Sequence, residues 1–112
     1  MATSYKVLGQ SNPSATTATT LYTVPSATAA VVSSISVANL TATAATFRLI
    51  VQKSADVSGT ILNSQYIGYD ITVGASDTTI ITVGLTLATG DVIKVYGSTA
   101  NLAFQAFGSE VA

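Results

Sequence analysis

Apolar and polar side chains alternate over short stretches of this chain, most clearly over residues 45–53. Phe47, Leu49 and Val51 fall on one parity of that stretch, and the other parity begins with Arg48. Successive side chains of a strand point to opposite faces of a sheet, so this alternation predicts a half-buried β-strand. No stretch shows the sustained i, i+3, i+4, i+7 apolar spacing of an amphipathic helix, and we therefore expect no long helix.

Similar short runs recur along the chain and are rich in Thr, Val and Ile, which favour a pleated surface. Gly, Pro, Asn and Asp, which favour turns, separate them. Together with a run at 4–8, the expected strand segments are 21–24, 30–39, 45–53, 61–70, 71–73, 78–83, 92–96 and 101–107. About eight short strands predict an all-β fold, an antiparallel β-sandwich of either jelly-roll or immunoglobulin-like arrangement. The last two runs, joined through residues 97–100, are expected to form a hairpin.

The beginning of the chain differs from the rest. Residues 1–20 hold one short apolar run and then a Ser/Thr/Ala-rich connection with little apolar surface to bury. We expect an N-terminal strand or extended arm at 1–20 and a single β-sandwich domain at 21–112. The arm would contact a neighbouring molecule through Tyr5, Val7 and Leu8.

The interior of the sandwich is expected to come from the more apolar parity of each strand. The residues on that parity are Ile35, Val37, Phe47, Leu49, Val51, Ile81, Val83, Ile93, Val95, Leu102 and Phe104. This choice leaves several large apolar side chains on the other parity, outside the core.

Those outward side chains predict a contact between subunits. Ile50, Ile80, Tyr96 and Phe107 all fall on the outward parity, and Arg48 lies beside Ile50 on the same face. Four large apolar groups outside so small a core are more than scattered surface residues would explain. We expect a homo-oligomer, with a cyclic homotrimer favoured, and these five residues as candidate interface residues. The alternative is that a bulge inverts the parity of a strand and turns these side chains toward the core.

Composition removes most other functions. Four Lys+Arg against five Asp+Glu give a net charge of −1, so no basic stripe is present to bind a nucleic acid. There is no Cys, His or Trp, which removes thiolate and imidazole chemistry and nearly all transition-metal sites. No run approaches the roughly 20 apolar residues of a membrane helix. We expect no catalysis, no cofactor, no metal, no nucleic acid and no membrane.

The remaining polar groups have ordinary structural interpretations. Asp70, Asp77 and Asp91 lie at strand ends, where aspartate commonly stabilises a turn. Two of them could instead act as the carboxylate pair of a glycosidase, or the three could bind Ca²⁺. Adjacent strand residues point to opposite faces, which disfavours a nucleophile–base pair of Lys53 and Ser54. Turn formation is the favoured interpretation for the carboxylates.

Tyrosines offer one possible recognition surface. Tyr5, Tyr22, Tyr66, Tyr69 and Tyr96 could form a sugar-stacking platform, although packing at strand edges is the more common role of such residues. Glycan or receptor recognition is therefore kept as an alternative function.

Four segments carry a resemblance to known proteins. They are MATSYKVLGQ (1–10), LYTVPSATAAVVSSISVAN (21–39), QYIGYD (65–70) and GLTLATGDVIKVYGSTANLAFQAFGSE (84–110). In this order and spacing they resemble a family of short virion structural proteins of marine tailed phages, particularly those of cyanobacteria and related hosts. The resemblance covers nearly the whole chain and implies a virion component, made in the host bacterial cytoplasm.

Size, a surface poor in charge and the absence of catalytic groups agree with that implication. The first expectation is a capsid decoration, or cement, protein that binds the outer surface of the major capsid protein, or another virion protein, and stabilises the head. The alternative is a tail fibre, collar or tail-tip subunit, with or without glycan or receptor binding.

Overall fold

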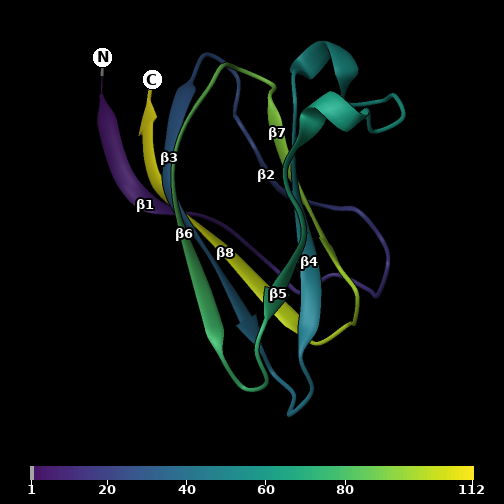
Figure 1. Ribbon diagram of the computed structural model, residues 1–112. Coiled ribbons are helices and arrows are strands. Elements are labelled where there is room, and N and C mark those ends of the chain that lie inside the picture. The colour runs from purple at the N-terminus through teal and green to yellow at the C-terminus, as the bar shows by residue number, and fades with distance from the viewer. Residues whose placement is uncertain (1) are drawn as a thin grey trace.

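The computed structural model describes residues 2–112 and shows a β-sandwich of two four-stranded antiparallel sheets. The first sheet, sheet 1, has the strand order β1-β8-β3-β6, and the second, sheet 2, has the order β2-β7-β4-β5 (Figure 1). The strands are β1 Thr3–Ser11, β2 Thr19–Thr23, β3 Ala29–Asn39, β4 Ala45–Gln52, β5 Tyr66–Val73, β6 Thr78–Leu87, β7 Val92–Gly97 and β8 Leu102–Val111. The all-β sandwich expected from the alternation pattern is confirmed.

Strand pairing identifies which sandwich this is. The hydrogen-bonded pairs are β1 with β8, β2 with β7, β3 with β6 and β4 with β5. This is the pairing of one long hairpin folded at its middle, and two further pairs, β3 with β8 and β4 with β7, wrap it into two sheets. An eight-stranded double sheet wrapped in this way is a jelly roll.

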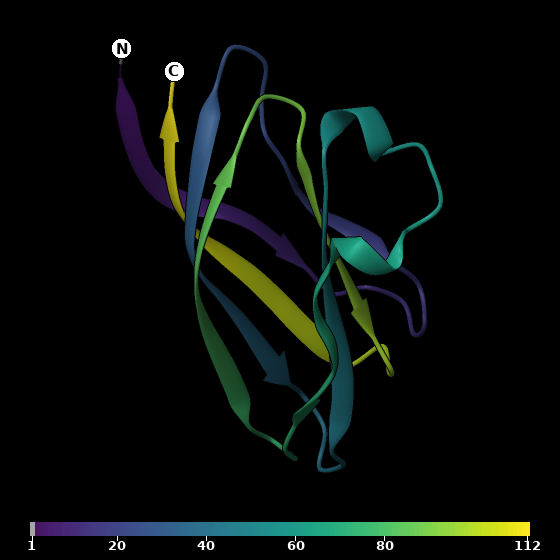
Figure 2. The same cartoon turned by 45° about the horizontal axis from the view of Figure 1, so that its top comes forward.

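The prediction that the last two strands form a hairpin is wrong. β7 belongs to sheet 2 and β8 to sheet 1, so the connection between them crosses from one sheet to the other. Alternation shows that a segment is a strand but carries no information about which strand it pairs with. The partners of β8 are β1 and β3, and the two chain ends lie side by side (Figure 2), joined by backbone hydrogen bonds between Ala2 and Ala112.

The segment expected as an arm is largely a strand of sheet 1. Thr3–Ser11 pair with β8 in antiparallel register, and residues 19 and 20 already belong to β2. At Gly9 the edge of β1 approaches sheet 2 so closely that a Cβ atom there would lie 2.1 Å from the carbonyl oxygen of Leu21. The boundary expected after residue 20 therefore does not separate an arm from a compact domain.

The expected core is confirmed. Of the eleven side chains, eight are buried, and Val51, Ile81 and Val83 are partly buried against them. Phe47 of sheet 2 and Phe104 of sheet 1 meet edge to face across the interior, with ring centroids 6.0 Å apart. The structure adds to this core the buried residues Leu21, Tyr22, Val24, Ala30, Val32, Ala45, Val73, Leu87 and Ala106.

The expectation that Ile50 lies on the exposed surface is wrong, because Ile50 is only 1% exposed. It pairs with Lys94 and shares the outward parity of β4, as expected, but residues 53–65 fold over that part of sheet 2. This segment holds two short 3-10 turns and is tied down where Gln52 Nε2 donates to Gln65 Oε1 at 3.0 Å and Lys94 Nζ donates to the carbonyl of Val57 at 3.3 Å. Ile50 is therefore a core residue of a second, small layer and is not a subunit contact.

Candidate interaction surface

Among residues 2–112, no charged side chain lies on the outward parity of the sheet 1 strands. Register places its residues in rows that cross all four strands, alternating with the rows that face the core. The outward positions include Tyr5, Val7, Gln10, Val31, Ser34, Ser36, Ala38, Thr78, Ile80, Thr82, Thr86, Ala103, Gln105, Phe107 and Ser109. We call this surface the uncharged face. Tyr5 is 84% exposed and Val31 39% exposed, so it presents apolar groups to solvent.

All nine charged residues of the chain lie elsewhere. Lys6 and Glu110 pair with each other where the two sheets splay apart, and the remaining charges lie on sheet 2 or in turns and connections. Those remaining residues are Arg48, Lys53, Asp56, Asp70, Asp77, Asp91 and Lys94. A surface of one sheet without charge is therefore a property of the fold as well as of the composition.

Shallow hollows mark the uncharged face, and two of them show what it offers a partner. One, of about 420 Å³, is lined by Tyr5, Lys6, Val31, Ser33, Phe107, Gly108 and Ser109. Lys6 is the one charged residue of this lining, and it forms a salt bridge with Glu110. The rest of the lining offers apolar groups and hydroxyls, so a contact here would be made mainly by shape and neutral hydrogen bonds.

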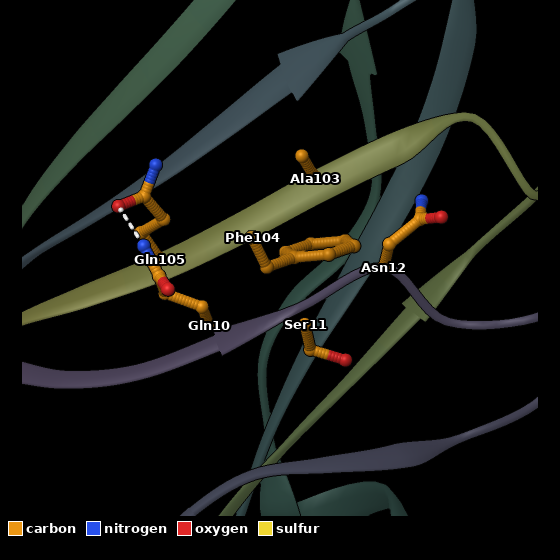
Figure 3. A pocket seen from close by; sticks show the side chains of 6 residues that line it. All are labelled: Gln10, Ser11, Asn12, Ala103, Phe104 and Gln105. Carbon is orange, nitrogen blue, oxygen red and sulfur yellow. Dashed lines mark hydrogen bonds between the residues drawn. The ribbon is translucent and has the colours of Figure 1, made fainter.

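The other hollow lies over the ends of β1 and β8 (Figure 3) and has a volume of about 330 Å³. Gln10 Nε2 donates to Gln105 Oε1 at 3.0 Å, and Asn12 Nδ2 donates to the carbonyl of Leu102 at 2.8 Å. These amides hold the edge strand to its neighbour, and no carboxylate or cation lines the hollow.

Sheet 2 has an aromatic and charged cluster on its outward face. The Arg48 guanidinium lies between two tyrosine rings, with Cζ 4.1 Å from the centroid of Tyr69 and 4.3 Å from that of Tyr96. Arg48 Nε also donates to Asp70 Oδ1 at 2.7 Å, and this bond raises the pKa of the guanidinium. Tyr66 meets Tyr69 edge to face at 5.0 Å. Arg48 therefore fills the space between the rings that a stacked ligand would need.

The five candidate interface residues do not form one patch. Ile80 and Phe107 lie on the uncharged face, Arg48 and Tyr96 lie on the opposite sheet, and Ile50 is buried. Outward faces of the two sheets of a sandwich point away from each other, so one contact cannot use both pairs. Of the candidate arm residues, Tyr5 and Val7 belong to the uncharged face, while Leu8 packs partly against the core.

The carboxylates considered for chemistry are held in local structure. Asp91 accepts from the backbone N–H of Ser54 and of Ala88, and Asp77 accepts from that of Thr78. Within residues 2–112 no group of three His, Cys, Asp or Glu side chains is placed to hold a metal ion. In the same residues no helix is long and apolar enough to cross a membrane.

A partly buried polar link joins the two sheets. Tyr22 Oη of sheet 2 donates to Glu110 Oε2 of sheet 1 at 2.5 Å, and Lys6 Nζ lies 2.6 Å from Glu110 Oε1. The hydrogen bonds from Lys6 and Tyr22 hold the pKa of Glu110 below its usual value, and burial raises the pKa of Tyr22. Sequence reasoning missed this link because its residues lie in three separate strands with no spacing signal.

This link predicts a pH dependence of folding. A carboxylate whose pKa is lower in the folded state stabilises the fold above its unfolded pKa, here 4.5, and loses that contribution as the pH falls through the folded value. Urea unfolding of the wild type and of Glu110→Gln should therefore show a stability difference that shrinks as the pH is lowered below 4.5. Tyr22→Phe, which removes one donor of two, should give an intermediate profile. A difference that is constant with pH would show that the carboxylate charge is not what stabilises.

Comparison of the chain with protein-family models, with curated proteins and with solved structures found no match.

Proposed function

We propose that this protein is a structural subunit of a phage virion, a capsid decoration protein that binds the major capsid protein on the outside of the shell through its uncharged face. The observation that carries the proposal is the absence of charge over a four-stranded sheet face with exposed Tyr5 and Val31. Charged residues are depleted at the centres of protein interfaces, and large apolar patches on a soluble protein mark interaction sites.

Two further observations support this function. The jelly roll is a fold of viral capsid proteins, and also of lectins and other proteins. The fold therefore agrees with a virion function but does not by itself identify one. Four segments of the chain resemble short virion structural proteins of tailed phages. A decoration subunit needs a stable fold and a contact surface and requires no catalytic group.

Binding to particles tests the proposal directly. Particles that lack the protein should bind the purified wild type in a co-sedimentation assay and bind Val31→Glu at least about tenfold more weakly, because burying an unpaired carboxylate costs more than the 1.4 kcal/mol that a factor of ten represents. Ile67→Glu is the matched control, since Ile67 is 44% exposed but lies on sheet 2. Equal binding by both variants would contradict a contact through the uncharged face.

Copy number separates the head from the tail. A decoration protein is present in hundreds of copies per particle, whereas a collar, tail-tip or fibre subunit is present in a few dozen at most. Quantitative mass spectrometry of purified particles, scaled to the major capsid protein, measures this number. A low copy number would favour the tail alternative.

Glycan recognition is the second candidate, and one observation favours it. Tyr66, Tyr69 and Tyr96, three of the five tyrosines considered for stacking, come together on sheet 2, with Tyr69 57% exposed. Arg48 occupies the faces of two of these rings, so a sugar would have to displace it. Binding on a glycan array that is lost in Tyr69→Ala would support this function.

A further inference from the structure

Strand β6 leaves a long edge of sheet 1 open. It spans ten residues, contains no charge and no proline, and has a neighbour on one side only. Natural proteins usually protect such an edge with charges, prolines or a covering loop, because its free N–H and C=O groups can pair with another strand. Within residues 2–112 no loop or side-chain hydrogen bond reaches residues 79–86 of this strand.

The other three edges of the sandwich are protected. β1 closes against β2 at Gly9 and Leu21, and β2 itself has only five residues. β5 is interrupted by two register shifts and by Asp70, whose φ of 49° lies in the left-handed region. β6 is thus the longest neutral edge among the described strands.

The sequence of β6 is self-complementary over its first half. Thr78–Thr82 pair with β3 in regular register, before a shift opposite Ser33. Their outward side chains are Thr78, Ile80 and Thr82, a pattern that is symmetric about Ile80, and Ile80 is 68% exposed. In an antiparallel pair centred on Ile80, each isoleucine would face its copy and each Thr78 would face a Thr82.

We propose that β6 is a self-association edge, at which a second copy of this chain adds its own β6 in antiparallel register about a two-fold axis through Ile80. Isoleucine against isoleucine and threonine against threonine are favourable cross-strand pairs, and no like charges meet. A two-fold axis normal to the sheet keeps both uncharged faces on the same side, so the pair forms one eight-stranded sheet with a doubled neutral surface. This contact is isologous, and it differs from the three-fold contact of the cyclic homotrimer expected from the sequence.

The pairing is independent of the virion function and is a property of the purified chain. A five-residue ladder buries less than the roughly 1,600 Å² of a standard stable interface, so a weak dimer is expected, in the micromolar to millimolar range. Sedimentation should show a mass that rises with protein concentration in the wild type and in Ile67→Lys, but not in Ile80→Lys.

Cysteine cross-linking tests the register, because the chain contains no cysteine. Residues directly opposite in an antiparallel pair have Cα atoms about 4.5–5.5 Å apart, inside the disulfide range of about 4.4–6.8 Å. With diamide as oxidant, Ile80→Cys should form a covalent dimer at least about tenfold faster than Ile67→Cys, since pairing raises the effective thiol concentration.

Two further variants determine which residue of the second copy lies opposite Thr78. Thr78→Cys and Thr82→Cys, one carrying a size tag, should cross-link to each other when mixed and only slowly when each is alone. A rate for Ile80→Cys equal to that of the Ile67→Cys control would overturn the proposal. Cross-linking of Thr78→Cys to itself as fast as to Thr82→Cys would overturn the stated two-fold register.

Discussion

Replacing Phe104 with alanine is expected to lower the free energy of unfolding by about 3–5 kcal/mol. Phe104 is fully buried near the start of β8, and its ring meets Phe47 of the opposite sheet at 74°. Truncation removes both the apolar burial and the edge-to-face contact that joins the two sheets, and it leaves a cavity that neighbouring strands cannot close. A domain whose total stability is about 5–15 kcal/mol loses a large share of it.

Phe107 provides the matched control for this experiment. It is the same residue type on the same strand, but it lies on the uncharged face and is only partly buried. Phe107→Ala should cost less than half as much in chemical denaturation of the isolated protein. Equal losses from the two variants would mean that Phe104 is not the residue that holds the sheets together.

Removal of residues 1–12 is expected to lower the melting temperature by about 10 °C or more, at roughly 4–8 °C for each kcal/mol lost. The deletion takes away β1, exposes the backbone edge of β8, and removes the bonds that Asn12 donates to the carbonyls of Ala100 and Leu102. It also removes Lys6 from Glu110. An arm that ordered only on the particle would leave the melting temperature unchanged.

Tyr5→Ser separates the backbone from the side chain in this test. The Tyr5 side chain is 84% exposed, so its loss should leave thermal unfolding of the isolated protein nearly unchanged. If the truncation and Tyr5→Ser both have small effects, β1 contributes little to stability, and the expectation of an arm would regain support.

Strand positions were predictable because each strand has one face on the core, and burial on one face imposes a period of two. The expected runs at 30–39 and 45–53 match Ala29–Asn39 and Ala45–Gln52 to within one residue at each end. The run expected at 61–70 matched less well, since residues 63–65 form a turn and β5 begins at Tyr66. Polar and apolar residues mix there because that segment packs on the outside of a sheet.

The outward parity of a strand shows where a side chain points but not what covers it. Ile50 points away from the main core, as its parity predicts, and is buried by a segment that begins only three residues later. Residues 53–65 show no periodic spacing of apolar side chains that would predict this cover. The segment is held in place by single hydrogen bonds, such as that from Gln52 to Gln65.

The uncharged face could not be found from sequence because it depends on pairing between distant strands. Tyr5 joins Ser109 and Val31 in one row only because β8 inserts between β1 and β3. Composition indicated a surface poor in charge, but the separation of all charge from one sheet face is a consequence of the jelly-roll order.

The central place of β8 in sheet 1 also constrains how the chain can be made. Among the described strands, β1 and β3 do not pair with each other, and both form backbone hydrogen bonds with β8, which follows the other seven in the chain. While residues 102–111 are still inside the ribosome, sheet 1 can contain only β3 and β6. The edge of β3 that pairs with β8 then has no neighbouring strand. Burial of the nascent chain's apolar surface is therefore delayed until the eighth strand emerges, and folding dominated by such distant pairings is slow.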